Sequence, residues 1–84
     1  MPDLTAQETA AESAYGFALE CVAMGLGYAD TGREIQARWG GWLNPGTIRE
    51  TIREAYVDAR MQGVEHEDIA PSMHRAHKGW TNPR

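Results

Sequence analysis

Three histidines near the C-terminus are the side chains of this chain most able to bind a metal. His74 and His77 stand three positions apart, so on a helix they would share one face. A structural zinc site normally needs four ligands, usually including cysteine. His66 and Glu67 begin the HExxH pattern of zinc proteases, but Ala70 stands where the second histidine is required. The pattern therefore favours histidines on the surface of a polar helix, without a metal.

Groups that could act as nucleophiles occur singly. Cys21, the only cysteine, falls on an apolar stripe of a predicted helix, where a buried thiol is usually inert. Ser13 and Ser72 have no neighbours that would complete a catalytic triad, and no glycine-rich nucleotide motif is complete. A lone helical domain of 84 residues seldom holds a pocket large enough for catalysis. We therefore expect a protein without enzymatic activity, cofactor or small-molecule substrate.

A row of arginines in the segment 44–62 offers a candidate binding surface. On a helical wheel the isoleucines of this segment share a buried face, and basic and acidic residues form two separate stripes. The basic stripe consists of Arg49, Arg53, Tyr56 and Arg60, and we call its three arginines the arginine row. Arginine can pair with phosphates or with guanine edges. The alternatives are a contact with another protein, or a solvated surface on which Glu50 and Arg53 pair.

The stretch 31–62 resembles a helix-turn-helix unit, whose second helix enters the major groove of DNA. Such a unit needs an apolar residue in its first helix, where this chain has Ile35, and a glycine in its turn, where it has Gly40. Thr47 stands near the start of the second helix. The turn is about two residues longer than the tight form, and the acidic stripe would approach the phosphates. The resemblance implies a DNA-binding regulator that uses the arginine row, which we keep as the alternative function.

Tryptophans are frequent for a chain of this size and stand where a partner could reach them. If the loop after residue 39 is exposed, Trp42 and Leu43 form an anchor of the kind found at interface hot spots. Otherwise Trp39 and Trp42 fill gaps in a core that has few large side chains. Trp80, in the C-terminal tail, either covers the core or contacts a partner. We take Trp42, Leu43 and Trp80 as candidate binding residues beside the basic stripe.

Helical periodicity and capping signals place these side chains on four predicted helices, and no segment shows strand alternation. The expected helices cover 5–26, 32–39, 44–62 and 68–78. The third is the best defined, because Asn44 is a good N-cap, Pro45 suits the first helical position and Gly63 suits the end. We expect an all-α fold, a compact bundle of three to four helices that forms one domain over residues 1–84.

Local signals set the expected limits of the other helices. Capping boxes at Thr5–Glu8 and Thr31–Glu34 predict where the first two helices begin. Gly25 and Gly27 are expected to end the first helix in the left-handed conformation. Pro71 is tolerable only within the first turn of the fourth helix.

The charge distribution favours a protein partner over a nucleic acid. Residues 1–30 carry five acidic side chains and no basic one, and the net charge of the chain is −4. Nucleic-acid binders usually show a clear basic footprint. The predicted first helix is apolar on most of its sides, so it needs neighbours that so small a chain can hardly supply. We therefore expect a module that binds another protein or forms a homo-oligomer, with DNA as a further candidate partner.

Composition also suggests a setting for the protein. A single cysteine and the lack of a secretion signal indicate the reducing cytoplasm, and no apolar stretch is long enough to make a membrane a partner. The preference for arginine over lysine, with abundant alanine and glycine, indicates a GC-rich genome. Small proteins of this composition are common in bacteriophages and mobile elements. Our hypothesis is a virion component or an inhibitor of host machinery, located in the host cytoplasm or the virion.

Overall fold

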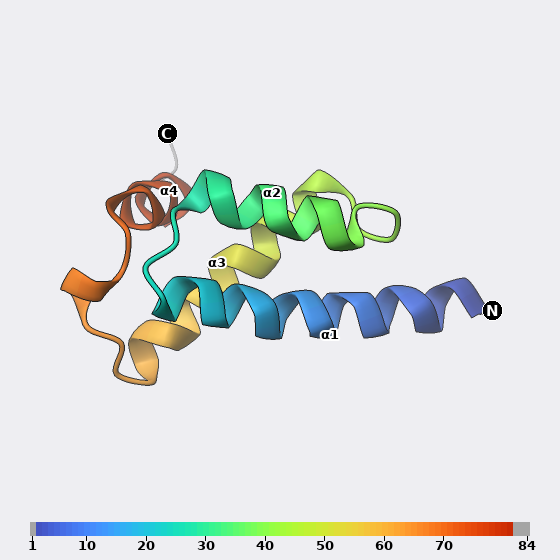
Figure 1. Cartoon of the computed structure of the whole chain (residues 1–84), viewed down its shortest axis with the longest axis horizontal. Helices are drawn as coiled ribbons and strands as arrows, with labels where there is room; N and C mark the ends of the chain where they lie inside the picture. Colours follow the sequence, from blue (N-terminus) through green and yellow to red (C-terminus); the bar gives the residue numbers. More distant parts are fainter. Residues whose placement is uncertain (1, 82–84) are drawn as a thin grey trace.

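Four α-helices and one short 3-10 helix make up the computed structural model of this chain (Figure 1). The structure describes residues 2–81, and the side chains from 6 to 78. In chain order the elements are α1 (Pro2–Ala23), α2 (Tyr28–Trp39), α3 (Pro45–Met61), the 3-10 helix η1 (His66–Asp68) and α4 (Pro71–Thr81). No strand occurs among residues 2–81, so the expected all-α bundle is confirmed. Within that range no helix is both long and apolar enough to cross a membrane.

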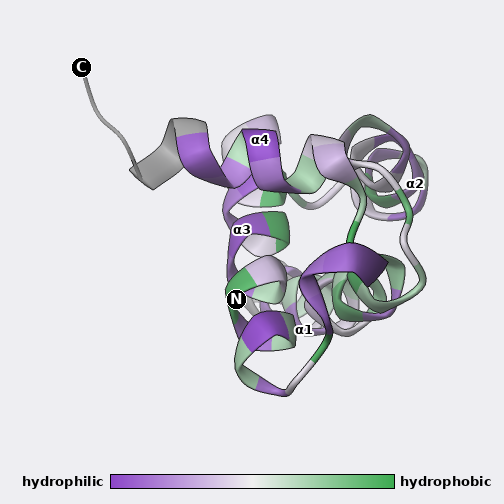
Figure 2. Ribbon diagram, turned by 90° about the vertical axis from the view of Figure 1, so that its left-hand side faces the viewer, coloured by the Kyte–Doolittle hydropathy of each residue, from purple (hydrophilic) through white to green (hydrophobic). Residues whose placement is uncertain are grey.

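The arrangement of the helices leaves one end of α1 less covered than the other. Helices α1 and α2 lie side by side and antiparallel, and α3 crosses behind both (Figure 1). At the end of the bundle, α4 packs against α2 and α3. Figure 2 shows that the outward side of α3 is hydrophilic and the side toward the other helices is hydrophobic. The N-terminal turns of α1 extend past the end of α2, so they have neighbours on fewer sides (Figure 1).

Small side chains on α1 form the core together with isoleucines and alanines on α3. Ala14 and Ala18 are fully buried, and their small size allows the two helix backbones to approach closely. The four positions of α3 that its periodicity predicts to be buried, Ile48, Ile52, Ala55 and Ala59, are buried, and Thr51 and Tyr56 are buried as well. A polar contact also joins the two helices, because the Tyr15 hydroxyl donates a hydrogen bond to the Asp58 carboxylate.

The start of α1 differs from the expectation, and its end agrees only in part. α1 begins at Pro2, before Thr5, so Thr5 lies within the helix and is not its cap. It ends at Ala23, and Gly25 then adopts the predicted left-handed conformation, with a φ of 82°. Gly27 is not left-handed, because its φ of −74° and ψ of 164° are extended and lead directly into α2.

The second helix begins about one turn earlier than the Thr31 capping box predicts. Its first residue is Tyr28, and Thr31 lies inside it with a fully buried side chain. The backbone N–H of Tyr28 donates to Ser72 Oγ on α4 at 2.8 Å. A distant hydroxyl therefore satisfies the start of α2 in place of a local cap, and such a cap has no signature in the sequence around residue 28.

Helix α3 agrees with its prediction at both ends. The Asn44 side chain accepts a hydrogen bond from the backbone N–H of Thr47 at 2.8 Å, and Pro45 is the first helical residue. Gly63 follows the helix with a φ of 102°, a conformation that favours glycine. Local sequence signals therefore define this helix completely.

Helix α4 begins later than expected and runs further. Its first residue is Pro71, which therefore lies in the first turn as required, and residues 66–68 form η1 instead. The helix continues past Gly79, its expected end, to Thr81. Ile69 and Met73 are buried, so they join the core as expected.

Candidate binding surface

The arginine row does not form one continuous free face. Arg53 pairs with Glu50, with nitrogen and oxygen 3.3 Å apart, and its side chain is 38% exposed. Arg60 Nη1 donates to the carbonyl oxygen of Val64 at 3.3 Å. Arg49 is exposed and makes no ion pair with any residue that the structure describes. Two of these three arginines are therefore engaged within the fold, and Arg49 is available to a partner.

Tyr56, which the helical wheel places on the exposed basic stripe, is buried. Only 8% of it is exposed, because α4 packs against this side of α3. Its hydroxyl lies 2.7 Å from His74 Nδ1, and its ring centre lies 4.5 Å from that of His77. The predicted exposure of Tyr56 is therefore wrong, since a helical wheel carries no information about what covers each face.

The three histidines gather where η1, α3 and α4 meet. The rings of His66 and His74 stack with their centres 3.8 Å apart, and His74 Nε2 lies 3.0 Å from the carbonyl oxygen of His66. His74 and His77 are half-buried, so the expectation of surface histidines holds for His66 alone. Among the described residues, no group of side chains is suited to hold a metal ion.

Other reactive side chains serve the fold. Cys21 is buried, and burial raises the pKa of its thiol, which keeps it in the inert protonated form. The hydrogen bond to Asp58 raises the pKa of the Tyr15 hydroxyl. Ser72 accepts the hydrogen bond that caps α2. Each of these groups therefore has a structural role in the bundle.

The loop between α2 and α3 separates two of the candidate binding residues. Trp42 is 51% exposed, whereas Leu43 is buried and belongs to the core rather than to an exposed anchor. Trp39 is half-buried, and its ring packs edge-on against Phe17 with the ring centres 5.7 Å apart. The side chain of Trp80 lies outside the described residues. Of these candidates, Trp42 is therefore the one that the structure places at the surface.

Three backbone hydrogen bonds fix the loop that carries Trp42. The N–H of Gly40 donates to the Gln36 carbonyl at 2.9 Å, and the N–H groups of Trp42 and Leu43 both donate to the Trp39 carbonyl, at 2.9 and 3.0 Å. A side chain at position 40 would collide with the carbonyl and the side chain of Gln36, so glycine is needed for this close approach. These contacts and the buried Leu43 hold the backbone of Trp42 in place.

Gly40→Ala should lower the free energy of unfolding by about 1–3 kcal/mol, because the new methyl group must displace Gln36 or the loop. Gly41→Ala is the matched control, since a Cβ there would meet nothing within 4 Å. The control should be neutral or more stable by up to about 1 kcal/mol, because alanine restricts the unfolded chain. Urea denaturation measures both variants, and equal stabilities would show that Gly40 is not required for the loop.

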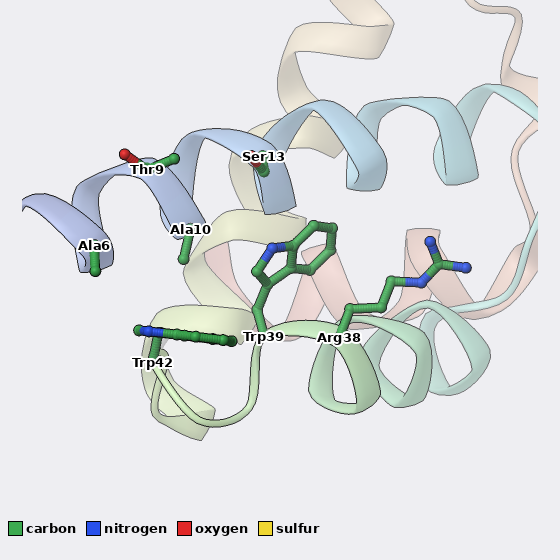
Figure 3. A pocket seen from close by; sticks show the side chains of 7 residues that line it. All are labelled: Ala6, Thr9, Ala10, Ser13, Arg38, Trp39 and Trp42. Atoms are coloured by element: carbon green, nitrogen blue, oxygen red, sulfur yellow. The ribbon is translucent and has the colours of Figure 1, made fainter.

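Trp42 stands between two hollows on the protein surface. We call Trp42 and the residues that line these two hollows the Trp42 surface. The larger hollow, of about 430 Å³, lies between the N-terminal half of α1 and the end of α2 (Figure 3). The α1 side is formed by Ala6, Thr9, Ala10 and Ser13, and the opposite side by Arg38, Trp39 and Trp42. In Figure 3 the Trp39 ring points toward α1, and the Trp42 ring lies below Ala6 and Ala10. The smaller hollow, of about 260 Å³, is lined by Trp42 and by residues that include Glu8, Ala11 and Thr47.

The charge available around these hollows is negative. Arg38 contacts the larger hollow, but its guanidinium lies 4.3 Å from the centre of the Phe17 ring and 3.4 Å from a Glu34 carboxylate oxygen. Glu8 and Glu12 are exposed, and neither forms an ion pair within the part of the chain that the structure describes. Hollows lined by small side chains beside an exposed indole suit the apolar side chains of another protein, and the glutamates around them form a polar rim.

Sequence reasoning identifies Trp42 but misses the α1 side of this surface. Ala6, Thr9, Ala10 and Ser13 recur at helical spacing and therefore share one face of α1, which is the signal that could have located it. The apolar character of α1 predicts burial on most of its sides, and helical spacing alone does not show which of its faces stays accessible. Arg38 has no sequence feature that distinguishes it from the other arginines.

The function of the Trp42 surface has to be inferred from its own geometry. The surface joins residues of α1, α2, the loop after α2 and the start of α3. It combines apolar walls with Glu8, which makes no ion pair among the residues that the structure describes. Neither a family model, nor a curated protein, nor a solved structure matches this chain.

Proposed function

We propose that this chain is a non-catalytic binding module that acts through protein–protein contacts at the Trp42 surface. The observation that carries the proposal is Trp42 itself, whose side chain is 51% exposed although backbone hydrogen bonds hold its loop. Because the backbone of this loop is already ordered, a partner that covers the indole has little backbone entropy to remove. Tryptophan is among the residues most enriched at interface hot spots.

The hollows on either side of Trp42 support the same proposal, because they give a partner places to insert side chains around the indole. Binding would then remove the remaining exposed area of the ring from water, which is favourable in proportion to the apolar area buried. A virion component and an inhibitor of host machinery both need a contact of this kind. We propose the module in either of these two settings.

Selection of binding peptides from a displayed random library tests the proposal. The immobilised protein should enrich apolar peptides, whose affinity should fall about 30-fold for Trp42→Ala, equivalent to a hot spot of about 2 kcal/mol. Met61→Ala is the matched control, because it removes another exposed apolar side chain, 80% exposed, at the end of α3. Binding to this control should be unchanged.

Two results would contradict the proposal. One is the absence of any peptide enriched over the empty support. The other is a set of enriched peptides that bind Trp42→Ala as tightly as the unmodified protein. Circular dichroism of both variants establishes that each remains folded.

A second candidate function, DNA binding by a helix-turn-helix unit, is supported by the position of Arg49. This residue is exposed near the start of α3, which follows α2 after a short loop. Glu50 and Glu54 are exposed on the same helix and would oppose the approach of phosphates. Titration with random duplex DNA at about 50 mM salt distinguishes the two functions. Salt-sensitive binding that Arg49→Ala abolishes would favour DNA, and no binding would remove this candidate.

A further inference from the structure

We infer that the partner presents to the Trp42 surface an amphipathic helix with basic residues beside its apolar face, an inference that rests on the proposed function. The α1 residues that line the larger hollow run from Ala6 to Ser13, which corresponds to about 10 Å along the helix axis. Two turns of a partner helix cover the same length. An amphipathic helix presents its apolar anchors at positions i, i+3 or i+4, and i+7 over that distance.

The shape of the surface suits a helix that packs along α1. Ala6, Thr9 and Ser13 are small and accessible, and Ala10 between them is small and buried, so another helix backbone can approach α1 closely at this face. The N-terminal turns of α1 extend past the end of α2 (Figure 1). Because Trp42 lines both hollows, apolar anchors of the partner placed on its two sides would enclose the indole.

The charge of the surface specifies the residues that flank the apolar face of the partner. Glu8 lines the smaller hollow, and Glu12 follows it one turn further along α1. Both are exposed without an ion pair among the described residues. The basic residue at the larger hollow, Arg38, is already paired with Glu34. Lysine or arginine beside the apolar anchors would therefore complement this rim, whereas acidic flanks would be repelled.

The same charges argue against a second copy of this chain as the occupant. Pairing α1 with α1 of another molecule would bring together two helices that each carry four acids and no base. Each chain also has a net charge of −4, which adds long-range repulsion between copies. A basic helix from a different protein meets neither penalty.

Two synthetic peptides of about 18 residues, long enough to form a helix, test the inference. Both peptides carry the same leucine face and lack tryptophan. In the basic peptide lysine and arginine flank that face, and in the acidic peptide glutamate takes their places. Binding is followed by the intrinsic tryptophan fluorescence of the intact protein and by calorimetry. The basic peptide should bind about tenfold more tightly than the acidic one at about 50 mM salt. This preference should shrink at about 300 mM salt, where screening is stronger.

Variants of the protein identify the residues responsible. Trp42→Ala should weaken binding of the basic peptide about 30-fold, and the Glu8→Gln, Glu12→Gln double variant should remove the preference between the two peptides. The Glu65→Gln, Glu67→Gln double variant is the matched control. Glu67 lies in η1 and Glu65 directly before it, and both are exposed and line neither hollow of the Trp42 surface. The control should keep the preference unchanged.

The possible failures are distinguishable. Equal binding of both peptides with full dependence on Trp42 would overturn the basic partner and leave the proposed function standing. If neither peptide binds, the inference of a helical partner is wrong. If the selection from the displayed library also enriches no peptide, the protein-binding function is wrong as well. A dimer in sedimentation that Trp42→Ala dissociates would assign the surface to a second copy and overturn the inference.

Discussion

Met73→Ala should lower the free energy of unfolding by about 2–5 kcal/mol, the range for large-to-small substitutions in a packed core. Met73 is fully buried on α4, and its neighbour Ser72 accepts the hydrogen bond that caps α2. Loss of its contacts would therefore loosen α4 and also the start of α2. For a domain of this size such a loss is a large part of the total stability.

Met61→Ala provides the matched control, because it makes the same chemical change at a side chain that is 80% exposed. Its effect should stay within about 0.5 kcal/mol. Urea denaturation at neutral pH measures both variants. Equal losses in the two variants would mean that α4 does not pack on the bundle as the structure describes.

Acidification from about pH 7.5 to about pH 5 should lower the stability, because the folded protein binds a proton at His77 less readily than the unfolded chain does. Burial, then the charge of Arg53 and then His74 hold the pKa of His77 below its ordinary value of about 6.5. Well above that value the imidazole is neutral in both states and contributes nothing. As the pH falls through about 6.5 the unfolded chain is protonated first, so stability declines until the folded-state pKa is passed.

The variant His77→Gln isolates this contribution. Chemical denaturation at several pH values between about 7.5 and about 5 should show a shallower decline for the variant than for the unmodified protein. The comparison of slopes remains valid even if glutamine changes the stability at neutral pH. Parallel curves for the two proteins would show that His77 does not cause the decline.

The sequence is sufficient to predict α3 but not the start of α2. Every signal that defines α3 is local, because Asn44, Pro45 and Gly63 lie within a few residues of its ends. The start of α2 depends on Ser72, which is 44 positions from Tyr28. Sequence patterns around residue 28 cannot report a hydroxyl that arrives through the tertiary fold.

The candidate site, like the helices, is predictable from the sequence only in part. The unusual loop sequence draws attention to Trp42, and the structure exposes it, but the adjacent Leu43 points into the core. Helical periodicity groups Tyr56 with the arginines, yet α4 covers Tyr56. The hollows depend on how far α2 extends along α1 (Figure 1), which no local pattern specifies. Residues that form their own contacts within a helix are thus predictable, and surfaces shared between helices are not.

The most direct test of the protein-binding function is one ratio of dissociation constants. A labelled peptide selected on the unmodified protein is titrated with that protein and with Trp42→Ala, and binding is followed by fluorescence anisotropy. A surface centred on Trp42 predicts about 30-fold weaker binding to the variant, with the helical content of the variant unchanged. A ratio near one would contradict it.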